Sequence, residues 1–317
     1  MIEIFLMIIG IILLIKGAEF LVDGSSSIAK HLGVSSIVIG LTVVALGTSL
    51  PELFVNLFAA VDNQPDISLG NIIGSNMANI LLILGISILI FGTIQIKRYT
   101  VKYELPLAIA VVMIFIILSG ILFFNIGIIT RLNGIILLFV LGLFVSYIYV
   151  VHVRKDVEKK SVDIKLHSTL TSTIIILFGC AALYLGGKWT VEGAIYLARQ
   201  FGLSEFLISA TIIAVGTSLP EFATSIVAIR KKQIDISVGN IIGSNIINIC
   251  LIIGITALIN PIRVEKYLLM DFLVLLASTV FVYLLVLTDK NREFKRWHGG
   301  LLVTGYIVYI VFLIIRN

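Results

Sequence analysis

Long apolar runs, separated by short polar or charged segments, recur along the whole chain. Most of these runs approach the length of about 20 residues that an α-helix needs to cross a bilayer. Charged and turn residues bound ten of them. The expected spans are 3–21, 36–60, 68–91, 104–123, 127–150, 168–188, 205–229, 237–260, 266–288 and 298–315. The pattern therefore predicts an all-α integral membrane protein with ten transmembrane helices.

The composition agrees with this pattern. Of the 317 residues, 59% are hydrophobic and 13% are charged, whereas soluble domains have about 45–50% apolar and about 25% charged residues. These values exclude a soluble globular domain, a disordered chain and a fibrous repeat. Cys180 and Cys250 lie inside apolar runs. We expect both to pack as small core side chains rather than to form a disulfide or bind a metal.

Lys and Arg residues are unevenly distributed among the loops. When the charged segment 152–167 is placed in the cytoplasm, the loops on that side contain 16 of the 23 Lys and Arg residues, and the opposite loops contain 6. This bias is the positive-inside pattern. It predicts a multi-pass protein of the cell membrane, surrounded by lipid, with both termini outside. Because topology explains the net charge of +5, no nucleic-acid partner is expected.

The chain repeats itself at an offset of 169 residues. The segment 47–52 (GTSLPE) is identical to 216–221, and the segment 70–76 (GNIIGSN) is identical to 239–245. In the surrounding 46 aligned positions, 25 residues are identical without a gap. Chance similarity between apolar segments would not align Pro, Glu, Asp, Asn and Gly together, so the two segments form an internal repeat.

Each half of the chain contains five of the expected spans. An odd number of spans forces the second half to enter the membrane from the opposite side, which predicts an inverted-topology repeat. This architecture is typical of secondary transporters, whose binding site lies near the midplane between the repeats. The expected parts are a first five-helix repeat at 1–151, a cytoplasmic charged loop at 152–167 and a second five-helix repeat at 168–317.

Two acidic residues, Glu52 and Glu221, occupy equivalent positions deep inside spans. An ionisable side chain near the bilayer centre costs roughly 2.5–3.5 kcal/mol on insertion scales, so a functional role is the default interpretation. Thr48 and Ser49 lie on the same helical face as Glu52, and Pro51 disfavours a regular helix before it. Thr217, Ser218 and Pro220 repeat this arrangement around Glu221.

The following span of each half adds a polar stripe. If the spans pack as hairpins, Ser75, Asn79, Ser244 and Asn248 face the two carboxylates, whereas we expect Asn71 and Asn240 to serve as interhelical contacts or backbone support. Carboxylate, hydroxyl, amide and carbonyl oxygens are hard donors that select Na⁺, Ca²⁺ or Mg²⁺. An irregular cage with two carboxylates favours Ca²⁺, since the charges cancel.

The paired motifs resemble the two alpha-repeats of the calcium/cation antiporter superfamily, and most closely those of prokaryotic sodium/calcium exchangers. The resemblance covers essentially the whole chain and implies a diamond of four cation sites. It implies a central calcium site built from the carboxylates of Glu52 and Glu221, backbone oxygens of Thr48 and Thr217, and Asn79 and Asn248. It implies sodium sites built from the same glutamates, Ser49, Ser75, Ser218 and Ser244, and backbone oxygens of Ala45 and Ala214.

The resemblance also implies a mechanism. Transport would proceed by alternating access, with the first and sixth spans sliding across the other eight, and would exchange three Na⁺ for one Ca²⁺.

Some prokaryotic members and the potassium-dependent branch have Asp at the position of Asn248, whereas both halves of this chain have Asn. This difference argues against potassium dependence. With two acids in the site, three Na⁺ leave a net charge of +1 and one Ca²⁺ leaves zero, so we predict electrogenic exchange.

Other functions remain open at this point. H⁺/Ca²⁺ exchange would use the same two glutamates, although the serine pairs favour sodium. A cation channel would have rings of acids, usually supplied by symmetric oligomers. An intramembrane enzyme would need a paired Asp, a His metal motif or a Ser–His arrangement, and none is found in the sequence. The expectation is therefore a transporter without a resident cofactor, which moves Na⁺ and Ca²⁺ and functions as a monomer.

Overall fold

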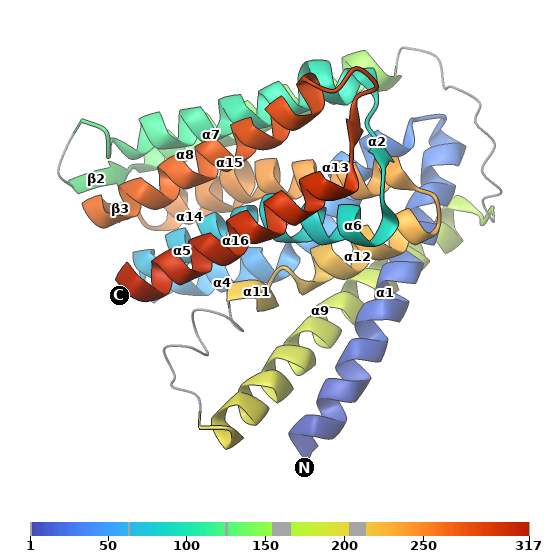
Figure 1. Ribbon diagram of the computed structural model, residues 1–317, viewed down its shortest axis with the longest axis horizontal. Helices are drawn as coiled ribbons and strands as arrows, with labels where there is room; N and C mark the ends of the chain where they lie inside the picture. The colour runs from blue at the N-terminus through green and yellow to red at the C-terminus, as the bar shows by residue number, and fades with distance from the viewer. Residues whose placement is uncertain (1, 63, 124–125, 154–165, 203–213, 317) are drawn as a thin grey trace.

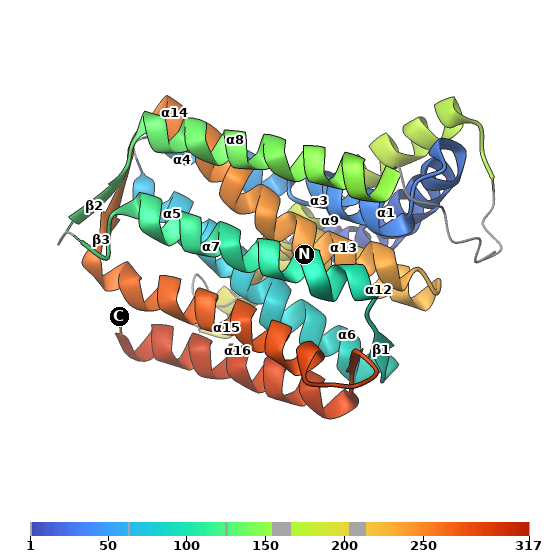
Figure 2. The same cartoon turned by 90° about the horizontal axis from the view of Figure 1, so that it is seen from above.

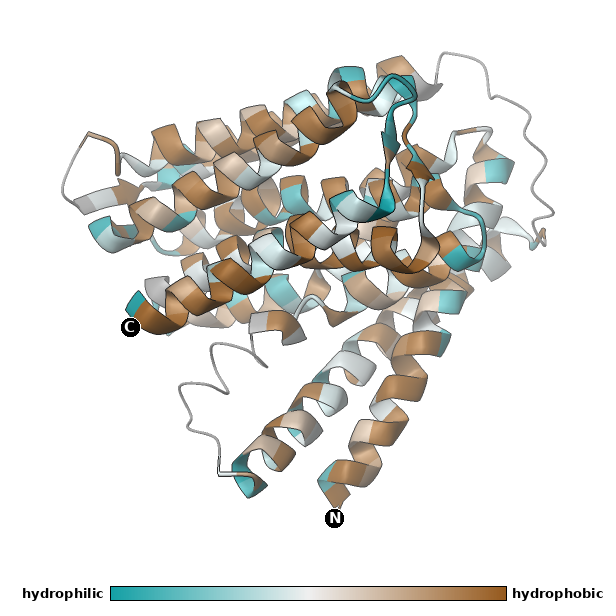
Figure 3. Ribbon diagram, viewed as in Figure 1, coloured by the Kyte–Doolittle hydropathy of each residue, from teal (hydrophilic) through white to brown (hydrophobic). Residues whose placement is uncertain are grey.

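The computed structural model describes residues 2–62, 64–123, 126–153, 166–202 and 214–316. These residues form a helical bundle (Figure 1). Most of the helices run side by side, while α1 and α9 pack on each other and diverge from the rest. Hydrophobic residues make up most of the helices, and hydrophilic residues gather mainly at the loops and helix ends (Figure 3). Many large hydrophobic side chains on the helices are exposed, as expected for a protein embedded in lipid.

Six of the expected spans are single helices in the described part of the chain, and some of them are extended by a short π or 3-10 turn. They are α1 (Ile2–Leu32), η3 with α7 (Thr100–Glu104, Leu105–Ser119), α8 with η4 (Arg131–Ile148, Tyr149–Val153), α9 (Thr169–Gln200), η7 with α15 (Lys266–Leu268, Leu269–Leu287) and α16 (Arg296–Arg316).

The remaining spans are interrupted, and the interruptions match between the halves. Two spans contain a central π-helical turn: α5, η2 and α6 (Pro65–Met77, Ala78–Ile83, Leu84–Phe91), and α13, η6 and α14 (Ile234–Ile247, Asn248–Ile253, Gly254–Ile259). Two are broken before a proline: α2, η1, α3 and α4 (Ser36–Ile39, Gly40–Val44, Ala45–Thr48, Leu50–Val61), and α11 with α12 (Ala214–Gly216, Leu219–Arg230).

Eight helices in the described part of the chain are long and apolar enough to cross a membrane. The count becomes nine when Ser36–Thr48 and Leu50–Val61, which meet at 48°, form one span. The expected seventh span, 205–229, begins among residues 203–213, which lie outside the described residues. The structure therefore gives an all-helical membrane protein, and the count of ten stays a prediction.

The first and sixth spans are longer than the sequence pattern predicts. We expected spans of 3–21 and 168–188, but α1 has 31 residues and α9 has 32. At 1.5 Å per residue, α1 is about 46 Å long, which exceeds a hydrocarbon core of about 30 Å, so the helix tilts or its polar end extends beyond the core. The polar continuation of α1 is stabilised within the protein, since Ser172 Oγ of α9 donates to Ser27 Oγ at 2.9 Å. A boundary drawn from hydropathy alone therefore lies before the observed end of the helix.

Glycines let α1 and α9 approach closely. They recur every seven residues on both helices, at Gly10, Gly17 and Gly24 and at Gly179, Gly186 and Gly193. A Cβ atom at Gly17 would lie 2.9 Å from the carbonyl oxygen of Gly179, and a Cβ atom at Gly179 would lie 2.9 Å from that of Gly17. Small residues at such contacts are typical of membrane helix pairs. The backbones are therefore in direct contact.

Two short antiparallel strand pairs, which the sequence pattern does not predict, join the halves at opposite ends of the bundle (Figure 2). β1 (Ile94–Gln95) pairs with β4 (Glu293–Phe294), and β2 (Ile126–Ile129) pairs with β3 (Ile262–Glu265). The expected span 127–150 therefore begins as a strand. Its helix starts at Arg131, because Thr130 Oγ1 accepts a hydrogen bond from the backbone N–H of Asn133 at 3.2 Å.

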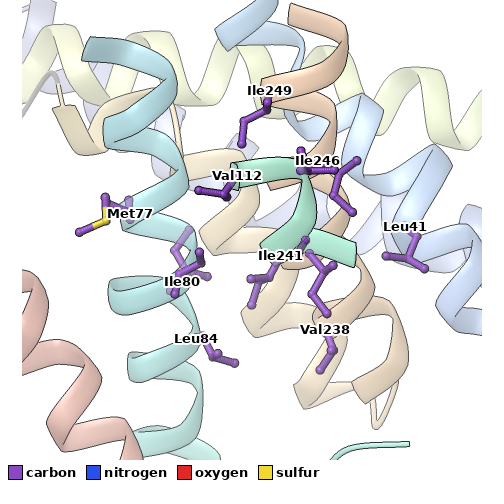
Figure 4. Close-up of a cluster of buried hydrophobic side chains, with 14 of the residues drawn as sticks. Leu41, Met77, Ile80, Leu84, Val112, Val238, Ile241, Ile246 and Ile249 are labelled. Carbon is purple, nitrogen blue, oxygen red and sulfur yellow. The ribbon is translucent and has the colours of Figure 1, made fainter. Parts of the chain in front are cut away.

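A buried apolar cluster holds the interrupted spans of the two halves together (Figure 4). The labelled side chains come from η1, α5, η2, α6, α7, α13 and η6, and all of them belong to the buried core. They are Leu41, Met77, Ile80, Leu84, Val112, Val238, Ile241, Ile246 and Ile249. This packing places the polar stripes of α5 and α13 beside the broken spans.

The contact between α1 and α9 gives the first testable prediction. Gly17→Ala places a Cβ atom against backbone atoms, which cannot be relieved by a side-chain rotation. We expect a loss of about 1–3 kcal/mol in stability, measured as a lower melting temperature of the purified protein in detergent. Gly142→Ala in α8 is the matched control, because its Cβ atom meets nothing within 4 Å. Equal melting temperatures for the two variants would contradict the close contact.

Candidate cation-binding site

Both glutamates lie in the first turn of a helix that begins after a break. α4 starts at Leu50 with Pro51 in its first turn, and α12 starts at Leu219 with Pro220 in its first turn. The residues at the breaks have nearly the same backbone geometry: Ser49 has φ −83° and ψ 8°, and Ser218 has φ −86° and ψ 6°. The repeated motif therefore folds in the same way twice.

The helix starts help to accommodate two buried acids. Glu52 and Glu221 both have 0% of their surface exposed, and the described part of the chain shows no ion pair to either of them. The N-terminal end of a helix carries a partial positive charge and unpaired N–H groups, which favour a nearby carboxylate. The break thus places each carboxylate where the backbone stabilises negative charge.

Hydroxyl groups from both halves surround Glu52. Ser75 Oγ of α5 donates to Glu52 Oε1 at 3.2 Å and lies 3.3 Å from Thr217 Oγ1 of the second half. Thr217 Oγ1 in turn donates to Asn71 Oδ1 at 3.1 Å. The side chains around Glu52 therefore come from both repeats.

The arrangement around Glu221 is the counterpart of this network. Ser49 Oγ of the first half donates to Glu221 Oε1 at 3.1 Å, and Ser244 Oγ of α13 lies 3.5 Å from the same oxygen. Thr48 Oγ1 lies 3.4 Å from Ser244 Oγ and donates to Asn240 Oδ1 at 3.0 Å. Neither half completes the site alone.

Asn71 and Asn240 contact the threonine hydroxyls of the opposite half. Asn240 Nδ2 also lies 3.4 Å from the carbonyl oxygen of Glu221 and 3.2 Å from Ser225 Oγ, to which it donates. Such contacts can orient the segments that carry the threonines, and the supporting role of Asn71 and Asn240 stays a prediction.

The π-helical turns carry Asn79 and Asn248. Asn79 Nδ2 donates to Asn245 Oδ1, and Asn248 Nδ2 donates to Asn76 Oδ1, both at 3.0 Å. Asn76 and Asn245 are not among the residues expected at the site, although the duplicated GSN triplet contains both. π-helical turns inside α-helices are frequent at functional sites.

Several buried oxygens at the centre have no hydrogen-bond partner within the described ranges. They are Glu52 Oε2, Glu221 Oε2, Asn79 Oδ1, Asn248 Oδ1 and Ser218 Oγ. Buried polar atoms are normally satisfied, and each exception needs an explanation. The donor set contains carboxylate, amide and hydroxyl oxygens and neither imidazole nor thiolate, so it fits a hard cation.

The expected backbone ligands are Ala45 and Ala214. The carbonyl oxygen of Ala45 lies 3.3 Å from Thr48 Oγ1 and 3.5 Å from Ser244 Oγ, which places it within the hydroxyl network. Ala214 is the first residue of α11 and follows residues 203–213, which lie outside the described residues. The structure therefore describes the surroundings of the expected ligand at Ala45 more fully than those of the expected ligand at Ala214.

Two other carboxylates are buried, but they have protein partners. Asp271 Oδ2 lies 2.7 Å from Arg316 Nη1, and Tyr309 Oη donates to Asp271 Oδ1 at 3.2 Å. Glu104 accepts a hydrogen bond from Tyr147 Oη at 3.1 Å. Both acids lie near the ends of expected spans, where the sequence pattern does not predict burial. The ion pair with Arg316 distinguishes Asp271 from Glu52 and Glu221.

A cavity of about 180 Å³ reaches Ser218. Apart from this serine, its walls are apolar and come from η2, α6, α11 and α12; they are formed by Ala78, Leu82, Ile83, Ile86, Val215, Leu219 and Phe222. Ser49, the counterpart of Ser218, instead donates to Glu221. The two halves of the site therefore differ in their contacts despite their repeated sequence.

Buried oxygens gathered between repeated, broken membrane helices are typical of cation-transport sites. The model of the family described as sodium/calcium exchanger protein matches residues 2–150 and 171–315. The chain belongs to this family, which confirms the resemblance and makes the protein a cation/Ca²⁺ antiporter of that family.

Individual relatives agree with this assignment. The sodium/calcium exchanger MaX1 of Methanosarcina acetivorans is 30% identical over 350 residues, which cover 97% of each protein. The Ca²⁺/H⁺ antiporter ChaA of Bacillus subtilis is 23% identical over 290 residues, covering 86% of this chain and 82% of ChaA. The solved structure of the sodium-calcium exchanger NCX_Mj soaked with 2.5 mM Na⁺ and 0.1 mM Ca²⁺ matches with a TM-score of 0.80 and 31% identity over 98% of each chain.

The unpaired carboxylate oxygens generate the second prediction. Glu52→Gln and Glu221→Gln keep the side-chain shape but remove a charge, so we expect Ca²⁺ transport to fall by more than about 100-fold, beyond the effect of losing an outer contact. Transport is measured in proteoliposomes with equal amounts of monodisperse protein. Glu104→Gln is the control, because Glu104 is equally buried but contacts Tyr147. Normal Ca²⁺ flux in either site variant would contradict the assignment.

Proposed function

We propose that this protein exchanges Na⁺ for Ca²⁺ by alternating access at the site between its two halves. The observation that carries the proposal is the set of buried, unpartnered oxygens around Glu52 and Glu221 in the described part of the chain. A bound cation satisfies them, and two carboxylates balance one Ca²⁺. The sodium/calcium exchangers named above, MaX1 and NCX_Mj, support Na⁺ as the second ion.

The ligands divide between a central calcium site and flanking sodium sites. The central site uses the carboxylates of Glu52 and Glu221, backbone oxygens of Thr48 and Thr217, and the amide oxygens of Asn79 and Asn248. The sodium sites use the same carboxylates, the hydroxyls of Ser49, Ser75, Ser218 and Ser244, and the carbonyl oxygens of Ala45 and Ala214. The hydroxyl contacts to both carboxylates support this division.

The proposed stoichiometry of three Na⁺ for one Ca²⁺ is what the resemblance to sodium/calcium exchangers implies, and charge determines its electrical consequence. The two glutamates contribute a charge of −2, which one Ca²⁺ neutralises and three Na⁺ exceed by one. Each cycle then moves one net positive charge in the direction of the sodium ions. Exchange is therefore electrogenic.

The architecture that supports this mechanism is ten spans in two inverted five-helix repeats, 1–151 and 168–317. Contacts at the site support the symmetry. Asn76 Nδ2 lies 3.3 Å from the carbonyl oxygen of Asn245, and Asn245 Nδ2 lies 3.4 Å from that of Asn76, at the repeat offset of 169 residues. Reciprocal bonds of this kind are expected about a pseudo-two-fold axis in the membrane plane.

The cellular placement follows from the positive-inside pattern. The proposed protein lies in the cell membrane with both termini outside and the charged loop 152–167 in the cytoplasm. That it functions as a monomer is a separate part of the proposal. Residues 154–165 of this loop lie outside the described residues.

A transport assay tests the coupling ion and the charge movement together. Proteoliposomes loaded with Na⁺ are diluted into Na⁺-free or Na⁺-equal buffer at fixed pH, and ⁴⁵Ca²⁺ uptake is measured. We expect uptake only with the outward Na⁺ gradient. An inside-positive potential set by valinomycin and external K⁺ should accelerate uptake, because each cycle exports one positive charge.

Two outcomes would overturn parts of this proposal. Uptake that ignores Na⁺ but follows an imposed pH gradient would identify H⁺/Ca²⁺ exchange through the same glutamates, the activity named for ChaA. Na⁺-driven uptake that is insensitive to the membrane potential would retain sodium coupling and exclude the ratio of three to one.

The serine hydroxyls give a further prediction. Ser75→Ala removes a hydroxyl that contacts Glu52 and Thr217, so the Na⁺ concentration for half-maximal exchange should rise about 10-fold, while the Ca²⁺ KM changes less. The control is Ser119→Ala in α7, which removes a buried hydroxyl bonded to the carbonyl oxygen of Ile116. Unchanged sodium activation in Ser75→Ala would argue against a sodium ligand at this position.

A further inference from the structure

Four asparagines join α5 and η2 to α13 and η6, and we refer to Asn76, Asn79, Asn245 and Asn248 as the asparagine quartet. Three of them have 0% of their surface exposed, and Asn245 has 5%. They are linked by four hydrogen bonds between the halves: two from Asn76 and Asn245 to each other's backbone carbonyl oxygens, and two from Asn79 and Asn248 to the side chains of that pair.

The chemistry of these bonds determines the direction of every amide. A backbone carbonyl oxygen can only accept, so the Nδ2 atoms of Asn76 and Asn245 must face the two carbonyl groups. Their Oδ1 atoms then point the other way and can only accept. The groups that meet them must therefore be the Nδ2 atoms of Asn248 and Asn79, which donate at 3.0 Å.

This orientation leaves the amide oxygens of Asn79 and Asn248 without a donor in the described part of the chain. Asn79 lies one helical turn after Ser75, which contacts Glu52, and Asn248 lies one turn after Ser244, which contacts Glu221. Residues at this spacing share a helix face. The unpartnered oxygens thus belong to the face that carries the cation site.

We propose that Asn76 and Asn245 are positioning residues, which hold the amide oxygens of Asn248 and Asn79 toward a bound Ca²⁺ and prevent their NH₂ groups from turning to it. The inference rests on the proposed function of the site. Outer contacts that fix a metal ligand typically affect affinity by about 10–100-fold. Backbone carbonyl groups anchor this orientation, so it persists when the cation leaves.

The same geometry selects an amide over a carboxylate at position 248. An aspartate there would place an oxygen against Asn76 Oδ1, so that two acceptors would face each other without a hydrogen. A carboxylate also presents an oxygen to the cation in either orientation, so it needs no positioning residue. Asn76 should therefore assist Ca²⁺ binding when residue 248 is Asn but not when it is Asp.

The test measures Ca²⁺ binding to the purified full-length protein by isothermal titration calorimetry, without Na⁺ and at fixed pH. Asn76→Leu removes the acceptor and should weaken Ca²⁺ binding about 10-fold or more relative to the unsubstituted protein. In the Asn248→Asp background, the same change should leave binding within about 2-fold or strengthen it, because the carboxylate needs no orientation. Ser119→Ala is the control for loss of a buried polar group away from the site.

Each outcome has a separate meaning. If the unsubstituted protein binds no Ca²⁺, the proposed function fails. If it binds Ca²⁺ and Asn76→Leu binds equally well, only the positioning role fails. Equal losses from Asn76→Leu with and without Asn248→Asp would show a merely structural role and would also overturn the inference. If Asn76→Leu does not fold, Asn245→Leu tested with Asn79→Asp is the equivalent pair in the other half, and the same criteria apply.

Discussion

The rest of the structure depends on one constraint. Two carboxylates are buried, and no cationic side chain lies beside them in the described ranges. Each costs roughly 2.5–3.5 kcal/mol to place near a bilayer centre. The fold reduces this cost by starting α4 and α12 just before Glu52 and Glu221, and by directing hydroxyl donors at one oxygen of each. The second oxygen of each remains unpartnered among the described residues. The breaks in the spans thus place both carboxylates at helix starts.

The donors that each glutamate needs come from both halves, which makes the site a property of their interface. Ser49 of the first half donates to Glu221, and Thr217 of the second half lies beside the serine that contacts Glu52. The strand pairs β1–β4 and β2–β3 also join the halves. The surroundings of both carboxylates therefore depend on how the two halves are held against each other. Sites between repeats are typical of secondary transporters.

Much of the molecule can be predicted from its sequence, because hydrophobic runs and duplicated polar motifs are local signals. The membrane class, the two glutamates and the serines around them follow from such signals. The lengths of α1 and α9 do not, since contacts such as that of Ser27 with Ser172 make polar turns helical. The burial of Asp271 depends on Arg316, 45 residues away. Whether an amide binds a cation or positions another side chain likewise depends on its hydrogen-bond partner. The spacing of residues in the sequence does not identify that partner.

In the proposed site, amides at positions 79 and 248 add ligand oxygens without adding charge, and this affects the proposed exchange. With both glutamates ionised, the empty site carries −2 in a low-dielectric surrounding, whereas the same site with Ca²⁺ is neutral. Moving a charged, unfilled site past apolar contacts is costly, so the transition is favoured when cations occupy it. Another carboxylate would leave the calcium-loaded site negative unless it bound a proton. Because the asparagine quartet is uncharged, one Ca²⁺ is enough to neutralise the proposed site. This favours exchange of Na⁺ for Ca²⁺ over movement of one ion without the other.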